Sequence, residues 1–256
     1  MNKIGILGGI GWMSTAEYYE GVCRLVEERH RSEGLSGVVA MPEIAIESLD
    51  LASARAYFGH DGHELSWSEF DRYHRDGLLR LQTAGADFAV IASNTPHLRL
   101  RQITRGVKLP VLSIVEAAAA ACVDIGVTHV LILGSAGIMR SRVFRDAFAQ
   151  RGIHAESPDS ERSRRIVTAT IRGVELGHLD GAAKRIHTVA TGPGARHLPE
   201  SSAVYLGCTE LSLVFPAYRN AGVFEYGGVR YLNSTALHIH ATFDRASEAL
   251  WVRAAG

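Results

Sequence analysis

Two polar loops follow apolar runs at corresponding places in the two halves of the chain. Residues 93–97 (SNTPH) come after residues 88–92, and residues 208–210 (CTE) come after residues 203–206. In parallel-sheet proteins, ligands bind at the carboxyl ends of strands, where loops and helix N-termini meet. Thiol, hydroxyl, amide and imidazole groups placed there can bind a small polar molecule or transfer protons. These two loops are therefore the candidate site.

Cys208 is the most reactive candidate, because it lies between the end of a predicted strand and the start of a helix. A free thiol has a pKa of roughly 8.5, and we expect the helix N-terminus to lower it. A desolvated thiolate can remove an α-proton beside a carboxylate if the developing enediolate is stabilised. The competing interpretation is a small core residue at a strand end.

Ser93 is not an equal base, since a serine hydroxyl needs a neighbouring base to take its own proton. His97 lies about one helical turn further along and is the nearest candidate for that base. The alternative is that Ser93 only caps a short helix while His97 bonds a backbone carbonyl. The residues alone leave both interpretations open.

Two further patterns suggest a cofactor or a metal and are judged insufficient. Gly9 and Gly11 begin a dinucleotide-like motif, but Ser14 occupies the third glycine position. The histidines of residues 59–74 lack a defined third ligand, so a mobile polar lid is favoured over a metal site. We expect neither a cofactor nor a metal.

Runs of Val, Ile and Leu alternate with helix-period segments along most of the chain, which is typical of parallel βα units. Strands are expected at residues 4–7, 38–46, 88–92, 110–114, 130–133, 153–156 and 203–206. Helices are expected at residues 16–28, 115–123, 141–150, 159–176 and 234–251. Glycine turns follow the first strand of each half, at residues 8–11 and 134–137.

The predicted fold is α/β, with two similar, pseudo-twofold-related lobes, each a parallel sheet flanked by helices. The first lobe is expected to comprise residues 1–115 plus 227–256, because the last segment returns to complete it, and the second to comprise residues 116–226. Two halves that face each other would enclose one small site in the cleft between them, with the Ser93 loop on one side and the Cys208 loop on the other.

Composition excludes several classes of protein. The 256 residues contain 27 Lys and Arg against 27 Asp and Glu, so the net charge is zero and attraction to nucleic acid or anionic lipid is not expected. Three widely spaced cysteines indicate neither a disulfide framework nor a zinc ribbon, which favours a cytoplasmic location. The longest apolar stretch, residues 109–134, contains charged residues and cannot span a membrane.

Four segments, in this order, resemble the aspartate/glutamate racemase family of cofactor-independent amino-acid racemases. They are residues 4–19 (IGILGGIGWMSTAEYY), 93–97 (SNTPH), 206–211 (LGCTEL) and 233–238 (NSTALH), the last of which usually begins with Asp in that family. The resemblance implies a racemase (isomerase), independent of pyridoxal phosphate, that acts at the α-carbon of a small acidic amino acid such as aspartate or glutamate. It also implies two lobes with the site between them, often in a homodimer.

The resemblance also assigns roles to residues. The family uses two cysteines on opposite faces of the α-carbon; Cys208 matches the second, whereas Ser93 stands in place of the first. The residues implied to bind substrate are Gly9, Met13, Ser14, Ser48, Asn94, Thr95, Thr209 and Glu210, with His97 and His238 in support. The serine makes slow or direction-dependent racemisation the expectation.

Three alternatives stay open at this point. A one-base enzyme, such as a decarboxylase or an isomerase of a dicarboxylate, needs proton delivery from one face only. A degenerate carboxylate-binding protein would keep the pocket without turnover, and a nucleotide-binding oxidoreductase is the most distant possibility. In the first two cases the partner is still a small amino acid or dicarboxylate, and neither nucleic acid nor a membrane is expected.

Overall fold

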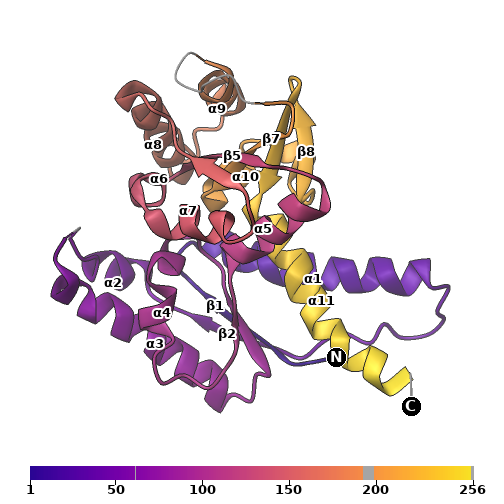
Figure 1. Ribbon diagram of the computed structural model, residues 1–256. Coiled ribbons are helices and arrows are strands. Elements are labelled where there is room, and N and C mark those ends of the chain that lie inside the picture. The colour runs from indigo at the N-terminus through magenta and orange to yellow at the C-terminus, as the bar shows by residue number, and fades with distance from the viewer. Residues whose placement is uncertain (61, 193–198, 255–256) are drawn as a thin grey trace. The chain divides into compact units, whose positions relative to one another are not determined.

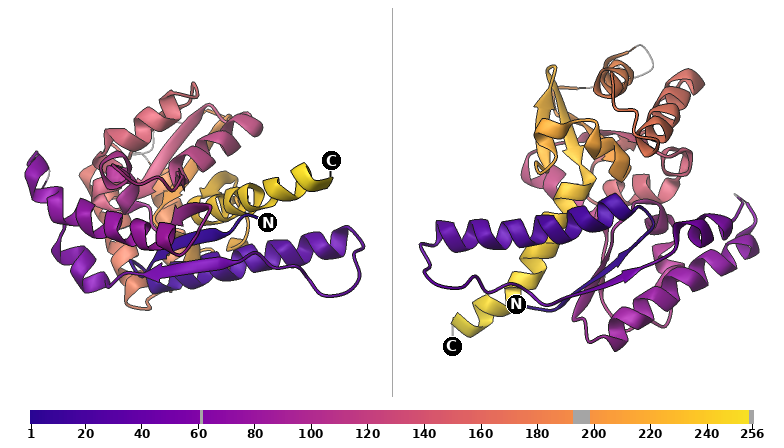
Figure 2. Two further views of the ribbon diagram at one scale, coloured as in Figure 1. Left: turned by 90° about the horizontal axis from the view of Figure 1, so that it is seen from below. Right: turned by 180° about the vertical axis from the view of Figure 1, so that it is seen from behind.

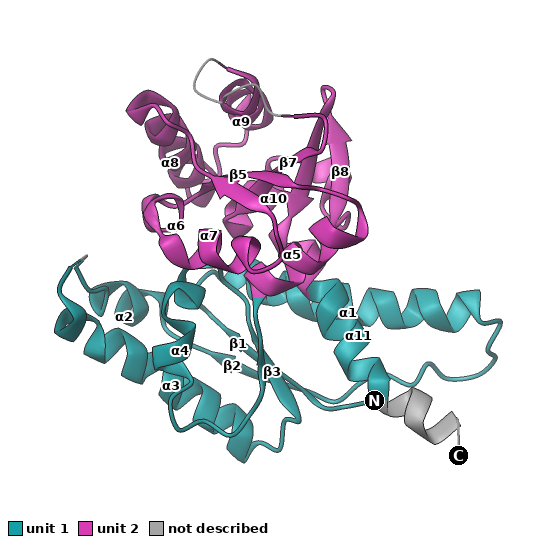
Figure 3. Ribbon diagram, in the orientation of Figure 1, with its two compact units in different colours: residues 1–113, 239–256 teal, residues 114–238 magenta. Residues whose placement is uncertain are grey.

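The computed structural model describes residues 1–60, 62–192 and 199–254 (Figure 1). The chain forms two compact units, residues 1–113 with 239–256 and residues 114–238 (Figure 3). Within the described ranges, no helix combines the length and apolarity that crossing a membrane requires. Each unit is built on a sheet with a parallel core, so the predicted α/β fold is confirmed.

Unit 1, residues 1–113 with 239–256, contains a four-stranded parallel sheet in the order β2-β1-β3-β4. Its strands are β1 (Ile4–Gly8), β2 (Ile44–Ser48), β3 (Phe88–Ile91) and β4 (Val111–Leu112). Its helices are α1 (Trp12–Ser32), α2 (Leu51–Ala56), η1 (Glu64–Trp67), α3 (Ser68–Thr83), η2 (Thr95–Arg99) and α4 (Leu100–Ile103), where η marks a 3₁₀ helix.

Side chains alternate between the two faces of this sheet, as the two-residue period of a strand requires. Ile4 and Ile6 of β1 pack against buried residues of α1, such as Tyr18. Leu7 faces the other way, into a cluster with α3 that includes Phe70 and Leu78. Helices therefore cover both faces, and β1 and β3 are buried along their whole length, whereas β2 at the edge is partly exposed. The layers can be followed in Figure 2.

Unit 2, residues 114–238, contains a five-stranded sheet in the order β6-β5-β7-β9-β8, in which β8 is antiparallel to β9. Its strands are β5 (His129–Gly134), β6 (His154–Glu156), β7 (Ser202–Gly207), β8 (Val223–Tyr226) and β9 (Val229–Asn233). Its helices are α5 (Ile114–Asp124), α6 (Ala136–Arg140), α7 (Arg142–Ala149), α8 (Glu161–Glu175), α9 (Ala182–Thr191), α10 (Thr209–Leu213) and η3 (Pro216–Tyr218); α11 (Ser234–Ala254) begins here and continues into unit 1.

Two expectations about chain organisation need correction. Residues 227–238 do not belong to the first lobe: β9 pairs in parallel with β7, so the chain returns to unit 1 only at Ile239. The second strand covers residues 44–48 rather than 38–46, because Ile44 is the residue that pairs with Ile4 while Val38 is 96% exposed. Val38 is apolar but no other element covers it, so its residue type wrongly predicted a strand there.

Gly9 is the residue whose backbone the first turn requires. Its φ of +80° lies in the left-handed region, and a Cβ placed there would lie 2.0 Å from the Leu49 carbonyl oxygen. The Leu49 amide in turn donates to the Gly8 carbonyl at 3.0 Å. The absence of a side chain therefore lets the turn after β1 lie directly against the chain that leaves β2.

We expect Gly9→Ala to lower the free energy of unfolding by about 2–5 kcal/mol, since alanine meets both the left-handed backbone penalty and the Leu49 clash. Gly34→Ala is the matched control, because Gly34 has φ +64° but no atom within 4 Å of its added Cβ. That variant should lose about 1–2 kcal/mol. Urea titration of both variants measures the difference, and equal losses would contradict the close-packing argument.

Candidate active site

Three strand ends of unit 1 bring predicted site residues to one edge of the sheet. Gly8 pairs with Ser48, and Leu7 pairs with Ile91. The Ala92 amide then donates to the Leu7 carbonyl at 2.9 Å, which extends the alignment to the start of the Ser93 loop. The glycine turn, Ser48 and the Ser93 loop thus share the carboxyl edge of this sheet.

The glycine turn is held by α1, which begins immediately after it. The Gly9 amide donates to the Thr15 hydroxyl at 2.9 Å, and that hydroxyl donates to the Gly11 carbonyl at 3.3 Å. Ser14 is buried and Met13 half-buried in the first helical turn. The structure therefore places Gly9, Met13 and Ser14 together at the start of α1.

His97 holds the Ser93 loop through the backbone. Its Nδ1 lies 2.9 Å from the Ser93 carbonyl oxygen, and the ring is 2% exposed. Burial lowers the pKa of His97 to about 4, against the opposing effect of the Ser93 and Leu112 carbonyls. The ring is therefore neutral near pH 7 and directed at a carbonyl, so of the two interpretations the geometry matches backbone bonding rather than a Ser-His relay.

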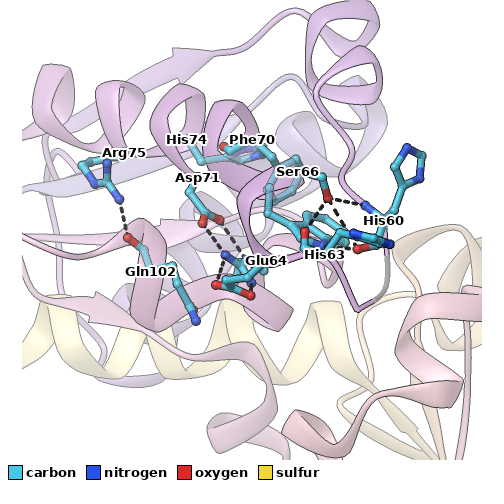
Figure 4. Close-up of polar contacts among 11 residues, drawn as sticks. His60, His63, Glu64, Ser66, Phe70, Asp71, His74, Arg75 and Gln102 are labelled. Atoms are coloured by element: carbon cyan, nitrogen blue, oxygen red, sulfur yellow. Dashed lines mark hydrogen bonds and ion pairs between the residues drawn. The ribbon is translucent and has the colours of Figure 1, made fainter.

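Arg99, the last residue of η2, binds two carboxylates of neighbouring helices. Its guanidinium donates to Asp71 on α3 at 3.0 and 2.5 Å and to Glu64 on η1 at 2.7 Å twice (Figure 4). It also lies 5.5 Å from the centroid of the Trp67 ring. Both carboxylates raise the pKa of Arg99 further. No side chain caps η2, so these tertiary bonds supply much of what fixes the Ser93 loop.

The histidines of the insertion are not brought together. His74 is fully buried inside α3, where Nδ1 lies 2.8 Å from the Phe70 carbonyl oxygen, whereas His60 and His63 are exposed. Among the residues that the structure describes, no three His, Cys, Asp or Glu side chains are placed to hold a metal.

The insertion that was predicted as a mobile polar lid is anchored by aromatic side chains next to it. Phe58 packs against Trp67 and Phe70 at ring distances of 5.1 and 5.2 Å. The Ser66 hydroxyl donates to the His63 carbonyl at 2.6 Å (Figure 4). His74 lies outside this loop because the helical period of α3 carries it into the core. Residues 60 and 62–65 are exposed, so the described part of the insertion is a surface loop, and its role as a lid stays a prediction.

In unit 2, three neighbouring strands end at a common edge that carries Cys208. Gly134 of β5 pairs with Gly207, and Asn233 of β9 pairs with Leu206. The next residues along these strands are Ser135, Cys208 and Ser234. Ser135 is a candidate that sequence reasoning missed; its position after β5, in the second glycine turn, was the available signal.

Cys208 is half-buried at the N-cap of α10 and lies against Glu210. Its Sγ donates to Glu210 Oε2 at 2.8 Å, and the buried Thr209 hydroxyl donates to the same oxygen at 3.2 Å. Burial raises the pKa of the Cys208 thiol well above its usual range, and the charge and hydrogen bond of Glu210 raise it further. The backbone hydrogen bond from Glu210 at the start of α10 does lower the pKa, but burial and the Glu210 carboxylate outweigh it, so the expected net lowering is wrong.

The contacts of Asn233 require an amide at a position where the resembling family usually has aspartate. Its Oδ1 accepts from the Thr235 and Ala236 amides at 3.1 and 3.3 Å, which caps α11. Its Nδ2 donates to the Arg219 carbonyl at 2.9 Å, a bond that a carboxylate cannot make. His238 follows one turn later and is fully buried.

Residues 7–242 match the sequence family described as Asp/Glu/hydantoin racemase. The broad specificity amino-acid racemase RacX of Bacillus subtilis (strain 168) is 28% identical over 114 residues, which are 44% of this chain and 46% of that protein. The aligned region thus spans less than half the length of that relative.

Two solved structures share the fold over nearly the whole chain. A putative Asp/Glu racemase from Yersinia pestis has a TM-score of 0.79 at 23% identity, and an aspartate racemase homologue from Pyrococcus horikoshii OT3 has a TM-score of 0.75 at 24% identity. Each comparison covers 97% of this chain and 100% of the other.

The neutral, buried His97 predicts a loss of stability in acid. An unfolded histidine has a pKa near 6.5, whereas that of folded His97 is about 4, so protons favour the unfolded chain between these values. The contribution is fully present above pH 6.5 and falls by about 3 kcal/mol as the pH drops to 4. Urea unfolding at several pH values should show a shallower acid slope for His97→Asn than for the wild type. His178→Asn, at an exposed site, should keep the wild-type slope; equal slopes for both variants would refute the assignment.

Proposed function

The chain belongs to the Asp/Glu/hydantoin racemase family, and on that premise we propose that it is a cofactor-independent racemase of a small acidic amino acid such as aspartate or glutamate. The observation that carries the proposal is the contact between the Cys208 thiol and the Glu210 carboxylate at 2.8 Å. It places a nucleophilic sulfur and a proton acceptor together at a strand end, where ligands bind in parallel-sheet folds.

Cys208 and Glu210 divide the work of proton abstraction in this proposal. Glu210 Oε2 takes the Sγ proton, and the thiolate then takes the α-proton of the substrate. Burial, which keeps Cys208 protonated at rest, also makes the thiolate a stronger base once it forms, because basicity rises with the pKa of the conjugate acid. Glu210 thus acts on the cysteine, in place of the substrate-binding role that the resemblance implied.

The negative charge that develops on the substrate carboxylate needs hydrogen-bond donors. Asn94 and Thr95 lie at the start of η2, and Thr209 lies at the start of α10. Backbone amides at the starts of helices point outward and favour anions. We assign these three residues to the α-carboxylate, where their donors would stabilise the enediolate as it forms.

Ser93 is the second proton-transfer position in this proposal, and it is the weaker one. A hydroxyl is far less acidic than a thiol, and the His97 ring that could have assisted it bonds the Ser93 carbonyl instead. The reaction should therefore be uneven: the enantiomer whose α-proton faces Cys208 exchanges faster than the other.

The same observation favours a second candidate, a one-base reaction. Decarboxylation, or isomerisation of a dicarboxylate, needs a proton donor on one face only, and Cys208 with Glu210 supplies it. The two candidates differ in whether the α-carbon is inverted, and the predictions below separate them.

Cys208→Ser should lower α-deuterium incorporation into aspartate and glutamate in heavy water by at least about a hundredfold, since it removes the proposed base. Cys23→Ala is the control, because Cys23 lies half-buried on α1 of unit 1. Mass spectrometry of both enantiomers measures the exchange. Unchanged exchange in Cys208→Ser would end the thiolate proposal.

Ser93→Cys should speed inversion, because a thiol replaces a hydroxyl at nearly the same volume. The gain should be larger for the enantiomer whose α-proton faces Ser93, and each tenfold gain corresponds to about 1.4 kcal/mol of barrier. Exchange and inversion are measured separately for each enantiomer by chiral chromatography. A folded variant that exchanges at the Cys208 face and still never inverts would favour the one-base candidate.

A further inference from the structure

A buried hydrogen-bond chain lies behind Cys208 and takes no part in the chemistry proposed above. The Ser234 hydroxyl, at the start of α11, donates to the Leu206 carbonyl at 2.6 Å. The Tyr205 hydroxyl of β7 is bonded to Ser234. Because serine has one hydroxyl proton and Leu206 takes it, Tyr205 must be the donor to Ser234. The chain thus runs from Tyr205 through Ser234 to a carbonyl two residues before Cys208.

The packing of β7 directs the Tyr205 ring toward the end of the strand. A Cβ on Gly207 would lie 2.9 Å from Cε1 of Tyr205, so the ring occupies the space beneath Gly207. Phe144 and Phe148 of α7 hold the ring, with centroids 6.1 and 5.6 Å away. Glycine at position 207 is therefore what allows the tyrosine to reach the carboxyl edge of the sheet.

Tyr205 and Cys208 leave the strand toward opposite faces. Leu206 and Cys208 pack in the cluster formed with α8 and α9, whereas the Tyr205 ring packs with α7. Tyr205 can therefore act on Cys208 through the backbone and not by direct side-chain contact. Burying a hydroxyl without a hydrogen bond costs free energy, and Tyr205 is fully buried. Its hydroxyl must therefore keep its hydrogen bond, and that bond fixes the orientation of the ring.

We propose that Tyr205 is a positioning residue for Cys208: through Ser234 it fixes the Leu206 carbonyl, and thereby the backbone from which the thiol reaches Glu210. The proposal deepens the proposed function and rests on it for the catalytic consequence. The effect on the thiol itself does not require any substrate, and it can be measured independently.

Tyr231 offers a matched control on the neighbouring strand. It is as fully buried as Tyr205, and its hydroxyl lies 3.0 Å from His187 Nδ1 on α9. Tyr231 pairs with Val204, which places it further from the strand end than Tyr205. Tyr231→Phe and Tyr205→Phe each remove one buried hydroxyl with a side-chain partner, but only the Tyr205 hydroxyl is bonded to Ser234 and so to the Leu206 carbonyl; Tyr231 packs in the cluster of Leu206 and Cys208 through its ring alone.

The test uses the whole protein and two readouts. Without substrate, iodoacetamide labelling followed by mass spectrometry gives the alkylation rate of each cysteine across a pH series. Tyr205→Phe should speed alkylation of Cys208 about fivefold, as expected for the loss of one hydrogen bond. Cys122 should stay protected, because it is fully buried in α5 and reports loosening of the whole unit. Tyr231→Phe should leave the alkylation of Cys208 unchanged.

The second readout is α-deuterium exchange with substrate. Tyr205→Phe should lower kcat about fivefold with KM unchanged, since positioning of the base is lost while substrate binding is retained. Ser234→Ala should give the same loss, and the double variant should lose no more than Ser234→Ala alone, because both residues act in one chain. Additive losses, or equal effects in Tyr231→Phe, would overturn the proposal.

The two proposals fail in different ways. If the wild type shows no exchange with any acidic amino acid, yet Tyr205→Phe still speeds Cys208 alkylation selectively, the racemase proposal fails and the positioning role stands. If exchange is present but Tyr205→Phe changes neither alkylation nor kcat, the positioning role fails alone.

Discussion

The parallel ladder between buried neighbouring strands is the constraint on which both candidate loops depend. Register pairs such as Leu7 with Ile91 and Leu206 with Asn233 end neighbouring strands at the same level. Because a one-residue slip would turn each strand's side chains onto the opposite face, the apolar pattern that buries the strands also fixes where they end. The polar residues at the edges are therefore located by the cores, although they contribute little to them.

The two loops are fixed by different chemistry. In unit 1, Arg99 is bound by the exposed carboxylate of Glu64 and by the buried carboxylate of Asp71, and removal of Asp71 from such a buried pair is expected to cost about 3–5 kcal/mol. In unit 2, neutral groups fix the loop that carries Cys208, through Tyr205, Ser234 and the Leu206 carbonyl. The neutral chain puts no full charge behind the thiol. A buried guanidinium at that place would lower the pKa of Cys208 and weaken the thiolate as a base.

Local sequence was sufficient for the two strands that precede the candidate loops, although not for β2. Residues 88–92 and 203–206 are apolar runs that end at polar residues, and β3 and β7 were predicted from them to within a residue or two. The return point at Ile239 could not be predicted, because it depends on the pairing of β9 with β7 across some 25 residues of chain. The burial of His74 could not be predicted from residue type either. The helical period of α3 turns His74 into the core, whereas His60 and His63 of the preceding loop are exposed.

For the candidate site, the sequence proposed residues but could not predict their contacts. Cys208 and Ser93 were proposed from residue type and position, but the direction of the thiol pKa depends on burial and on the Glu210 carboxylate beside Sγ. The same holds for His97: its spacing of about one turn from Ser93 suits a bond to the hydroxyl or to the carbonyl equally, and only the structure shows that the ring bonds the carbonyl. Ser135 was overlooked because residues 134–137 were considered only as a glycine turn.

In the proposed reaction, a buried thiol with a raised pKa can abstract a proton from carbon only when its own proton has a place to go. Fewer thiolates exist at rest, although each is a stronger base, and the rate depends on the product of the two. Glu210 reconciles the two demands, since at 2.8 Å it can receive the Sγ proton without any movement of the backbone. Ser93 has no such neighbour in His97, whose ring serves the backbone. The difference between the two loops therefore lies as much in the acceptor beside each side chain as in the exchange of sulfur for oxygen.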